Sequence, residues 1–403
     1  MSKALPHYFG TRRSVLGDGF IPRMDWDRPP YNRHTFINVR EFVPTAEVWR
    51  GRGPVSVMSE RRQNLDELPF TKPDGKQSTI GRFLADSFTD GFIVLHRGAI
   101  ITERYFGGMT GRSLHLSQSV AKSITGTVAG ILIGRGQFDP NAPITEYLPE
   151  LDATAYRGAT IQQVMDMTSG VRFDETYTDP CSDIGKVDVA SNWKPVPPEA
   201  PADAIWPRDM REVILSLKTK EAEHGARYQY RSIETDVLAF AMQRSSGQRL
   251  SDLVSELLWQ PMGAEESANF TVDPSGYALA EGGFNATLRD YARFGLVHLG
   301  NGHFNGHQIV PAAFVEDTRS GPHGHFNDSG RETLPNGCYR NTFWIVDRAK
   351  QVVQGRGVFG QLVHVDPHHD LVVVKLSSYP VFIDIDLTRE TNAAIDAITA
   401  ALS

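Results

Sequence analysis

The residues whose types and spacing most directly suggest chemistry are Ser119 and Lys122, three positions apart. Residues at this spacing lie on one face of an α-helix, so a helix starting here would place the lysine amine beside the serine hydroxyl. A serine hydroxyl becomes nucleophilic when a neighbour takes its proton, and desolvation is expected to lower the pKa of such a lysine. Serine-x-x-lysine also occurs by chance, and an exposed helix face is the alternative interpretation.

The surrounding sequence predicts a buried helix over residues 119–134. Its unpaired N-terminal N–H groups would favour negative charge developing near Ser119. Small residues lie between the apolar ones, which predicts close packing, and a lysine there is costly unless it has a task. Apolar side chains recur at helical spacing at Leu114, Leu116, Val120, Ile124, Val128 and Ile131.

A second element runs from Gly225 to Ala239 and contains Tyr230 and Ser232 just before an apolar helix pattern. Beside the Lys122 cation, the phenol of Tyr230 is expected to titrate below its usual value of about 10 and to act as a general base. A packing role for the ring is the alternative. Ser232 is expected to cap the following helix or to point its hydroxyl at a substrate.

A third element, Gly355–Gln361, contains Gly-x-Gly-x-x-Gly. A dinucleotide loop is rejected because the residues that follow predict a strand and a turn, whereas that fingerprint requires a helix. Glycines in a strand more often mark close backbone approach. We therefore expect an edge strand whose Val358 N–H joins that of Ser119 in an oxyanion hole.

Three strings carry a family resemblance: Ser-Val-Ala-Lys-Ser from Ser119, Tyr-x-Ser-x-x-Thr-Asp-Val-Leu-Ala from Tyr230, and Val-Lys-Leu-Ser-Ser from Val374. In this order they resemble the serine β-lactamase and penicillin-binding-protein superfamily, on the class C side that includes family VIII carboxylesterases. Within it the chain is most similar to nylon-oligomer amidases. The resemblance extends over residues 32–378 and implies an α/β (α+β), β-lactamase-like fold, in which helices flank an antiparallel sheet and an all-helical insert domain caps it.

The resemblance also implies roles for individual residues. Ser119 would be the acylated nucleophile, Lys122 and Tyr230 its proton partners, and Val358 an oxyanion-hole donor. Further positions would bind substrate: Tyr177 from a mobile loop, Asp188 facing a substrate ammonium, Trp193 lining the pocket, and Ser232, Glu281 and Gly357.

Two positions depart from the family pattern. Gly355-Arg356-Gly357 stands where β-lactamases have Lys-Thr-Gly, so Arg356 can take over anchoring of a carboxylate only if its side chain faces the site. Glu281 stands where the amidases have asparagine, and a second carboxylate there is expected to alter substrate preference.

Composition limits the partners. The chain has 403 residues, 40% hydrophobic and 22% charged, and its formal charge of −7 argues against nucleic acid or anionic membrane as partners. We expect a small-molecule amide or ester substrate, with a homodimer left open. No cofactor or metal is expected: Cys181 and Cys338 form no Cys-x-x-Cys motif, and the glycines around His303 and His307 favour a turn over a metal-binding helix.

The N-terminal sequence contains Arg12-Arg13, which is similar to a twin-arginine export signal. No apolar run of about 7–15 residues follows the arginines, as such a signal requires. We therefore expect a cytoplasmic protein.

The element pattern predicts strands near both ends and helices in the middle. A hairpin is expected at Phe92–Tyr105, helices at Ile161–Met167, Asp209–Leu217, Ile233–Gln243, Leu250–Leu258, Arg289–Leu299 and Thr388–Leu402, and strands at Phe343–Val346, Leu362–Val365 and Leu371–Leu376. We expect residues 1–155 and 275–403 to form the sheet domain and 156–274 the insert, with the active site in the cleft between them.

Three functions stay open at this point: an amidase on short linear oligomers, a broad short-acyl esterase or acyltransferase, and a non-catalytic binding or sensor protein. The loop acids Asp174, Glu175, Asp179 and Asp183 fit an exposed face at least as well as a role in substrate charge. A Gly-x-Ser-x-Gly motif is missing from the chain, which weakens an α/β-hydrolase interpretation.

Overall fold

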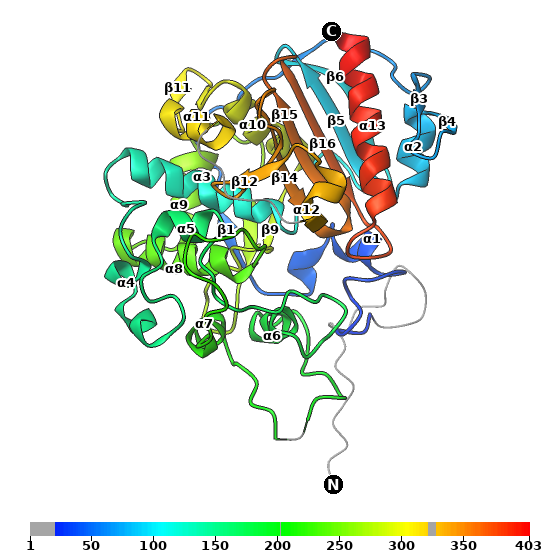
Figure 1. Ribbon diagram of the computed structural model, residues 1–403. Coiled ribbons are helices and arrows are strands. Elements are labelled where there is room, and N and C mark those ends of the chain that lie inside the picture. Colours follow the sequence, from blue (N-terminus) through cyan, green and yellow to red (C-terminus); the bar gives the residue numbers. More distant parts are fainter. Residues whose placement is uncertain (1–20, 202, 321–327) are drawn as a thin grey trace.

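A computed structural model describes residues 21–201, 203–320 and 328–403, so the Arg12-Arg13 segment lies outside the described residues (Figure 1). Its largest feature is an eight-stranded sheet in the order β12-β13-β14-β15-β16-β5-β6-β2. All neighbouring pairs are antiparallel except β2 and β6. The strands are β2 (Ser59–Glu60), β5 (Thr89–His96), β6 (Ala99–Tyr105), β12 (Cys338–Arg340), β13 (Phe343–Asp347), β14 (Val352–Gly357), β15 (Gln361–Asp366) and β16 (Leu371–Ser377).

The two ends of the described chain meet in this sheet. β16 pairs with β5 in a register that opposes Val373 to Val94. The predicted hairpin is confirmed: β5 and β6 are joined at Arg97 and Gly98, both with positive φ. The predicted construction of one sheet from early and late segments therefore agrees with the observed pairing.

Period-two alternation gives the sheet two buried faces. Ile93 and Leu95 of β5 join the larger hydrophobic core, whereas Phe92 and Val94 join a smaller one. The smaller core is covered by α13 (Ile385–Leu402), which lies across the sheet in Figure 1, and by α2 (Ile80–Asp86). On the opposite face lie α3 (Val120–Gly134), which touches β14 and β15, and α10 (Leu288–Leu299), which touches β5, β15 and β16.

Helices of the middle region pack against α3, because α8 and α9 both contact it. The region contains α4 (Ile144–Tyr147), α5 (Ile161–Met165), α6 (Asp183–Ala190), α7 (Met210–Ser216), α8 (Ile233–Ser246) and α9 (Leu250–Val254). It also contains a strand, β8 (Ala268–Thr271), in the range predicted to be helical. This strand belongs to a second sheet, β1-β8-β9-β7, with β1 (Thr45–Val48), β7 (His115–Leu116) and β9 (Phe284–Ala286). The division of the chain into domains stays a prediction.

Shorter elements complete the fold. These are α1 (Asn32–Thr35), β3 (Pro69–Thr71), β4 (Gln77–Thr79), β10 (His303–Phe304), β11 (His307–Gln308), α11 (Ala312–Ser320) and α12 (Asp328–Thr333). His303 and His307 lie on a two-stranded hairpin, as the glycines around them predicted. In the described part of the chain, no helix is both long and apolar enough to cross a membrane.

One predicted feature of the third element is wrong. β14 is an interior strand, since β13 and β15 pair with its two sides. The pairing with β13 ends at Gln354, whereas the pairing with β15 continues to Gly357. Only the end of β14, from Gly355 to Gly357, therefore has one edge without a strand partner.

Candidate active site

The Ser119 hydroxyl and the Lys122 amine lie together at the start of α3, as the spacing predicted. Lys122 Nζ donates a hydrogen bond to Ser119 Oγ at 2.9 Å. Ser119 occupies the N-cap position, and Gln118 before it has a φ of 48°, a left-handed conformation that is unusual for a residue with a side chain. Strain of this kind is common beside reacting groups, and here it turns Ser119 from β7 into the helix.

Lys122 is 1% exposed, and Glu281 supplies its other two acceptors. Nζ lies 2.6 Å from the Glu281 carbonyl oxygen and 3.3 Å from its Oε2. Glu281 sits between β8 and β9, in a turn tied to α8 because Asp236 accepts the Ala280 N–H at 2.8 Å. The turn is tight: a Cβ on Gly283 would lie 2.3 Å from Thr271 Oγ1. The ammonium is therefore held by three acceptors from two segments.

Tyr230 lies just before α8, and its ring centroid is 5.2 Å from Lys122 Nζ. The ring stacks on Trp344 of β13, with centroids 5.5 Å apart. Arg231, fully buried beside it, is anchored by Glu221 at 3.3 Å and Glu234 at 3.4 Å. The stacking on Trp344 and the ion pairs of the neighbouring Arg231 thus hold Tyr230 beside the Ser119–Lys122 pair.

The end of β14 touches the backbone of the nucleophile. A Cβ on Gly357 would lie 2.5 Å from the Ser117 carbonyl oxygen and 3.0 Å from Ser119 N. Close approach was predicted for these glycines, and the neighbour is the turn that carries Ser119. Val358, the next residue, lines the same two cavities as Ser119.

Glu175 joins the site from the loop before α6. Its carboxylate accepts hydrogen bonds from the Tyr177 hydroxyl at 2.7 Å, from the Ser232 N–H at 2.9 Å and from the Ser232 hydroxyl. Ser232 stands at the N-cap of α8 but makes no side-chain capping bond, so the predicted helix cap is wrong. The physical reason is that the nearby carboxylate is a stronger acceptor and takes its hydroxyl. The other alternative, a hydroxyl directed at a substrate, stays a prediction.

One side of Ser119 opens into a cavity of about 320 Å³, here called the acidic cavity. It is lined by the predicted binding residues Tyr177, Asp188, Trp193, Ser232 and Glu281, together with Asp25, Asp27, Asp179, Lys194 and Glu199. Trp193 is 5% exposed, and its Nε1 donates to Thr271 Oγ1 at 3.0 Å, so it is a packed wall of this cavity.

Asp188 already has a cation beside it. Lys194 Nζ lies 3.1 Å from an Asp188 carboxylate oxygen and 2.7 Å from one of Asp27. Burial raises the pKa of Asp188 to about 6 in spite of Lys194, whereas Lys194 itself has a raised pKa because the two carboxylates outweigh its burial. An internal ammonium thus occupies the position predicted for the ammonium of a substrate.

On the other side of Ser119 lies a cavity of about 630 Å³, here called the apolar cavity. Its walls include Phe173, Tyr228, Tyr230, Trp344, Leu362, Phe382, Ile383 and Ile385. Arg356 of β14 also lines it, beside Thr333 and Asn392, to which its guanidinium donates. Its role in anchoring a carboxylate stays a prediction. Among the side chains that the structure describes, no group of three or more His, Cys, Asp or Glu is placed to hold a metal ion.

Two predicted pKa directions are wrong. Burial works to lower the pKa of Lys122, but Tyr230, Glu281 and Glu175 raise it above its ordinary value. Burial raises the pKa of Tyr230 by more than Lys122 lowers it. The Lys122 ammonium and the Tyr230 phenol are therefore the prevailing forms at neutral pH. The sequence argument weighed the lysine–tyrosine pair alone and lacked the two carboxylates.

Glu175 and Lys194 are the site residues that the sequence reasoning missed. Glu175 was grouped with the loop acids, for which an exposed face and a role in substrate charge were both left open. Its position two before Tyr177 was the available signal, because alternate residues of an extended segment lie on one side. Lys194 follows Trp193 directly, but its pairing with Asp27 spans 167 positions, and no local pattern indicates it.

Comparisons with known proteins agree with this geometry. A family model named "Beta-lactamase" matches residues 79–397. The chain is 36% identical over 363 residues to the 6-aminohexanoate-dimer hydrolase of Paenarthrobacter ureafaciens, covering 89% of this chain and 88% of that protein. A solved structure from Bacillus anthracis, provisionally assigned as a 6-aminohexanoate-dimer hydrolase, superposes with a TM-score of 0.85 at 28% identity, over 97% of this chain and 99% of that one.

A more distant likeness concerns the fold alone. A family VIII carboxylesterase superposes with a TM-score of 0.58 at 16% identity, over 79% of this chain and 95% of that one. The predicted α/β, β-lactamase-like fold is therefore confirmed. By the family model and the 36% identical relative, this chain belongs to the β-lactamase family and is a serine hydrolase of amide or ester bonds.

Proposed function

We propose that Ser119 forms the acyl-enzyme and that the substrates are short linear amides of the 6-aminohexanoate-dimer class. The observation that carries the proposal is the 2.9 Å hydrogen bond between Lys122 Nζ and Ser119 Oγ, with the Tyr230 ring 5.2 Å from the same ammonium. The identity to the Paenarthrobacter ureafaciens hydrolase supports the substrate class.

The reaction starts from the form in which the Lys122–Tyr230 pair has lost one proton, since coupled groups titrate together. This form accepts the Ser119 proton while Oγ bonds to the substrate carbonyl carbon. The carbonyl oxygen becomes an oxyanion, stabilised by the N–H groups of Ser119 and Val358. The pair then gives the proton to the leaving nitrogen or oxygen as the carbonyl–heteroatom bond breaks. Water repeats the sequence and releases the acid.

The charged group of the substrate is recognised mainly by residues of the acidic cavity. Because Lys194 already neutralises part of the Asp188 charge, Asp188 attracts a substrate ammonium less strongly than a free carboxylate would. Glu281 and Glu175 add negative charge close to Ser119. Tyr177, stacked on Phe382 with ring centroids 5.4 Å apart, closes over the bound amide.

The test uses Ser119→Ala, with Ser123→Ala as matched control. Ser123 lies on the same helix, but its hydroxyl donates to the Thr342 carbonyl oxygen at 2.9 Å. We expect Ser119→Ala to lose both turnover and labelling by a fluorophosphonate, and Ser123→Ala to keep both. Persistent turnover, or labelling of another residue in Ser119→Ala, would contradict the proposal.

A broad short-acyl esterase is the second candidate, favoured by the size of the apolar cavity. The ratio of activity on 6-aminohexanoate dimer to activity on p-nitrophenyl butyrate separates the two. A ratio well below that of the Paenarthrobacter ureafaciens hydrolase, measured side by side, would favour the esterase.

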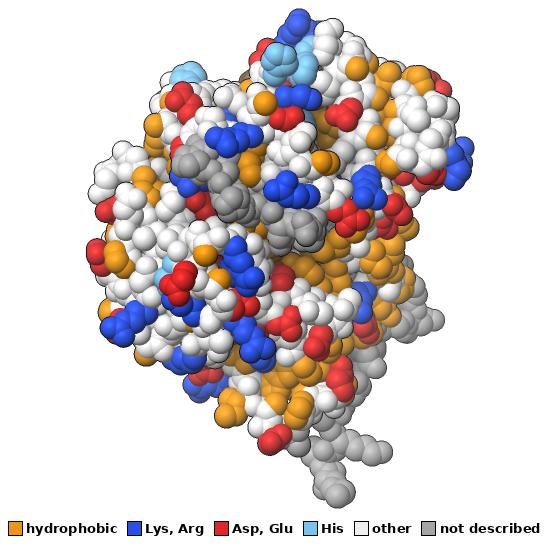
Figure 2. Space-filling view, in the orientation of Figure 1, with side chains coloured by type: hydrophobic (Ala, Val, Ile, Leu, Met, Phe, Trp, Pro, Cys, Tyr) orange, Lys and Arg blue, Asp and Glu red, His pale blue; other side chains and the backbone are white. Residues whose placement is uncertain are grey.

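For cellular context we propose a cytoplasmic enzyme that acts on small molecules and binds neither nucleic acid nor membrane. In support, Figure 2 shows acidic and basic side chains interspersed over one face, and Cys181 and Cys338 are both free thiols. Cell fractionation tests the location. A homodimer stays a prediction that sedimentation can test.

A further inference from the structure

Arg356 lies in the wall of the apolar cavity, and among the described residues its guanidinium donates to neutral acceptors only. Nε donates to Gln354 Oε1 at 2.6 Å, Nη1 to Thr333 Oγ1 at 3.1 Å and Nη2 to Asn392 Oδ1 at 3.4 Å. A guanidinium has five N–H donors, so two are left for a further acceptor among the described groups.

Buried charges in proteins are normally paired with an opposite charge. No carboxylate of the described residues forms an ion pair with Arg356, and burial lowers the pKa of its guanidinium to about 10. It therefore stays charged at neutral pH without a counter-ion among the described residues. A planar guanidinium with free donors is the side chain best suited to bind a carboxylate.

Other charges of the apolar cavity are acidic and have partners of their own. Glu175 accepts from Ser232 and Tyr177, Glu332 pairs with Arg389 at 3.4 Å, and Asp384 caps α13 by accepting the Leu387 N–H at 2.9 Å. Arg356 is the only lysine or arginine among the described residues that line this cavity. Away from the oxyanion hole, Arg356 is therefore the described lining side chain that attracts an anion.

We propose that Arg356 binds a carboxylate carried at the far end of the substrate arm that occupies the apolar cavity. The inference rests on the proposed function and adds to it the direction in which the substrate lies, with its anionic end away from Ser119. An alkyl arm lies against Trp344, Leu362 and Ile385, with the scissile carbonyl at Ser119 and an anionic end at β14.

The test uses two matched substrate pairs, because the cavity can hold either the acyl or the leaving arm. One pair is the p-nitrophenyl monoester of adipic acid and p-nitrophenyl hexanoate. The other is N-butyryl-6-aminohexanoate and N-butyrylhexylamine. We expect the wild-type enzyme to prefer the carboxylated member of one pair by about 10- to 100-fold in kcat/KM, the scale of hydrogen bonds to a charged group.

Arg356→Met is expected to abolish this preference, whereas Arg389→Met, a matched loss of positive charge at the ion-pair partner of Glu332, should retain it. No preference in either pair, or an equal preference in Arg356→Met, would overturn the inference. Should Arg356→Met not fold, competition by adipate against the wild type decides: inhibition much stronger than by 1-hexanol supports the subsite, and equal inhibition refutes it. Failure to turn over all four substrates would instead overturn the proposed hydrolysis.

Discussion

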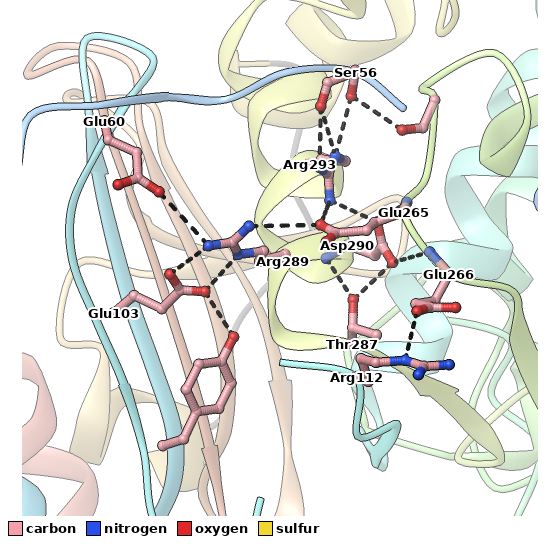
Figure 3. A network of polar contacts seen from close by, with 12 residues as sticks. Ser56, Glu60, Glu103, Arg112, Glu265, Glu266, Thr287, Arg289, Asp290 and Arg293 are labelled. Atoms are coloured by element: carbon pink, nitrogen blue, oxygen red, sulfur yellow. Dashed lines mark hydrogen bonds and ion pairs between the residues drawn. The ribbon is translucent and has the colours of Figure 1, made fainter. Parts of the chain in front are cut away.

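Two regions of the molecule hold clusters of buried or half-buried charge. Folding lowers the pKa of Glu103 in one region and raises the pKa values of Glu175 and Asp188 in the other. Around α10, Arg289 binds both oxygens of Glu103, at 2.7 and 2.9 Å, and Arg293 binds Asp290 at 3.0 Å and Glu265 at 3.1 Å (Figure 3). Burial works to raise the pKa of Glu103, but hydrogen bonds from Arg289, Tyr105 and Arg62 lower it to about 2. Folding therefore favours the ionised form of Glu103, whereas burial raises the pKa of Asp290 in spite of Arg293.

At the active site the balance is reversed. Burial raises the pKa of Glu175 and of Asp188, in the latter to about 6, and both remain close to further carboxylates. Folding therefore works against their ionised forms at neutral pH, which lowers stability. The contrast teaches that ionised Glu103, bound by Arg289, stabilises the fold, whereas the active site retains carboxylates whose ionised forms destabilise it in exchange for chemistry.

The largest contrast in kcat is expected between the variants Lys122→Met and Arg289→Met. Loss of Lys122 removes the proton partner of Ser119, and we expect kcat of the folded enzyme to fall by at least about 10³-fold. Arg289→Met should lower the free energy of unfolding and leave kcat of the folded enzyme near wild type. Steady-state kinetics with urea unfolding measures both, and equal kcat in the two variants would break the comparison.

Glu103→Gln tests the network through its pH dependence. A pKa lowered from about 4.5 to about 2 contributes stability that is fully present above pH 4.5 and is lost as the pH falls toward 2. After allowance for solvent screening, we expect the variant to lose about 2 kcal/mol at pH 7 and much less near pH 3. Urea unfolding at both pH values measures this loss. Glu212→Gln, at an exposed pair with Arg208, is the control and should change neither value.

Glu281→Gln tests the charge balance that sets the pKa of Lys122 at the active site. Glu281 raises the pKa of Lys122, so its removal should lower that pKa. The deprotonated Lys122–Tyr230 pair is the reactive form, and the rise of kcat/KM with pH should therefore move to lower pH. A pH–rate profile on a neutral ester measures the shift. A profile that stays in place or moves to higher pH contradicts the assigned charge balance.

Lys194→Met should give the smallest effect. It removes the internal ammonium beside Asp188 and Asp27, so a substrate ammonium gains two carboxylates to approach. We expect KM for ammonium-bearing substrates to fall by about 3- to 10-fold, while KM for neutral esters stays constant. Asp27→Asn, which keeps Lys194 on Asp188, is the matched control. An equal change for both substrate types would show only a general disturbance of the cavity.

Local pattern was enough to predict much of this molecule. The apolar periodicity after Ser119 predicted α3, which is observed at Val120–Gly134, and the Arg97-Gly98 turn predicted the β5–β6 hairpin. The Ser119–Lys122 contact follows from helix geometry alone. Features that depend on several distant segments were predicted less well. The pKa of Lys122 is raised because Tyr230, Glu281 and Glu175 approach it from other segments, and the pKa of Tyr230 is raised chiefly by its burial.

The pairing of β5 with β16 has a consequence for how the protein is made. The nucleophile and the hairpin β5–β6 leave the ribosome well before β14 and β16, because Leu371 of β16 follows its partner His96 of β5 by 275 positions. At about 5–20 residues per second, this interval lasts roughly 15 to 55 s. During it β5 has an unpaired edge rich in Ile, Val and Leu, the kind of edge that seeks other chains. Nascent chains of this enzyme should therefore depend on protection from aggregation until translation is almost complete.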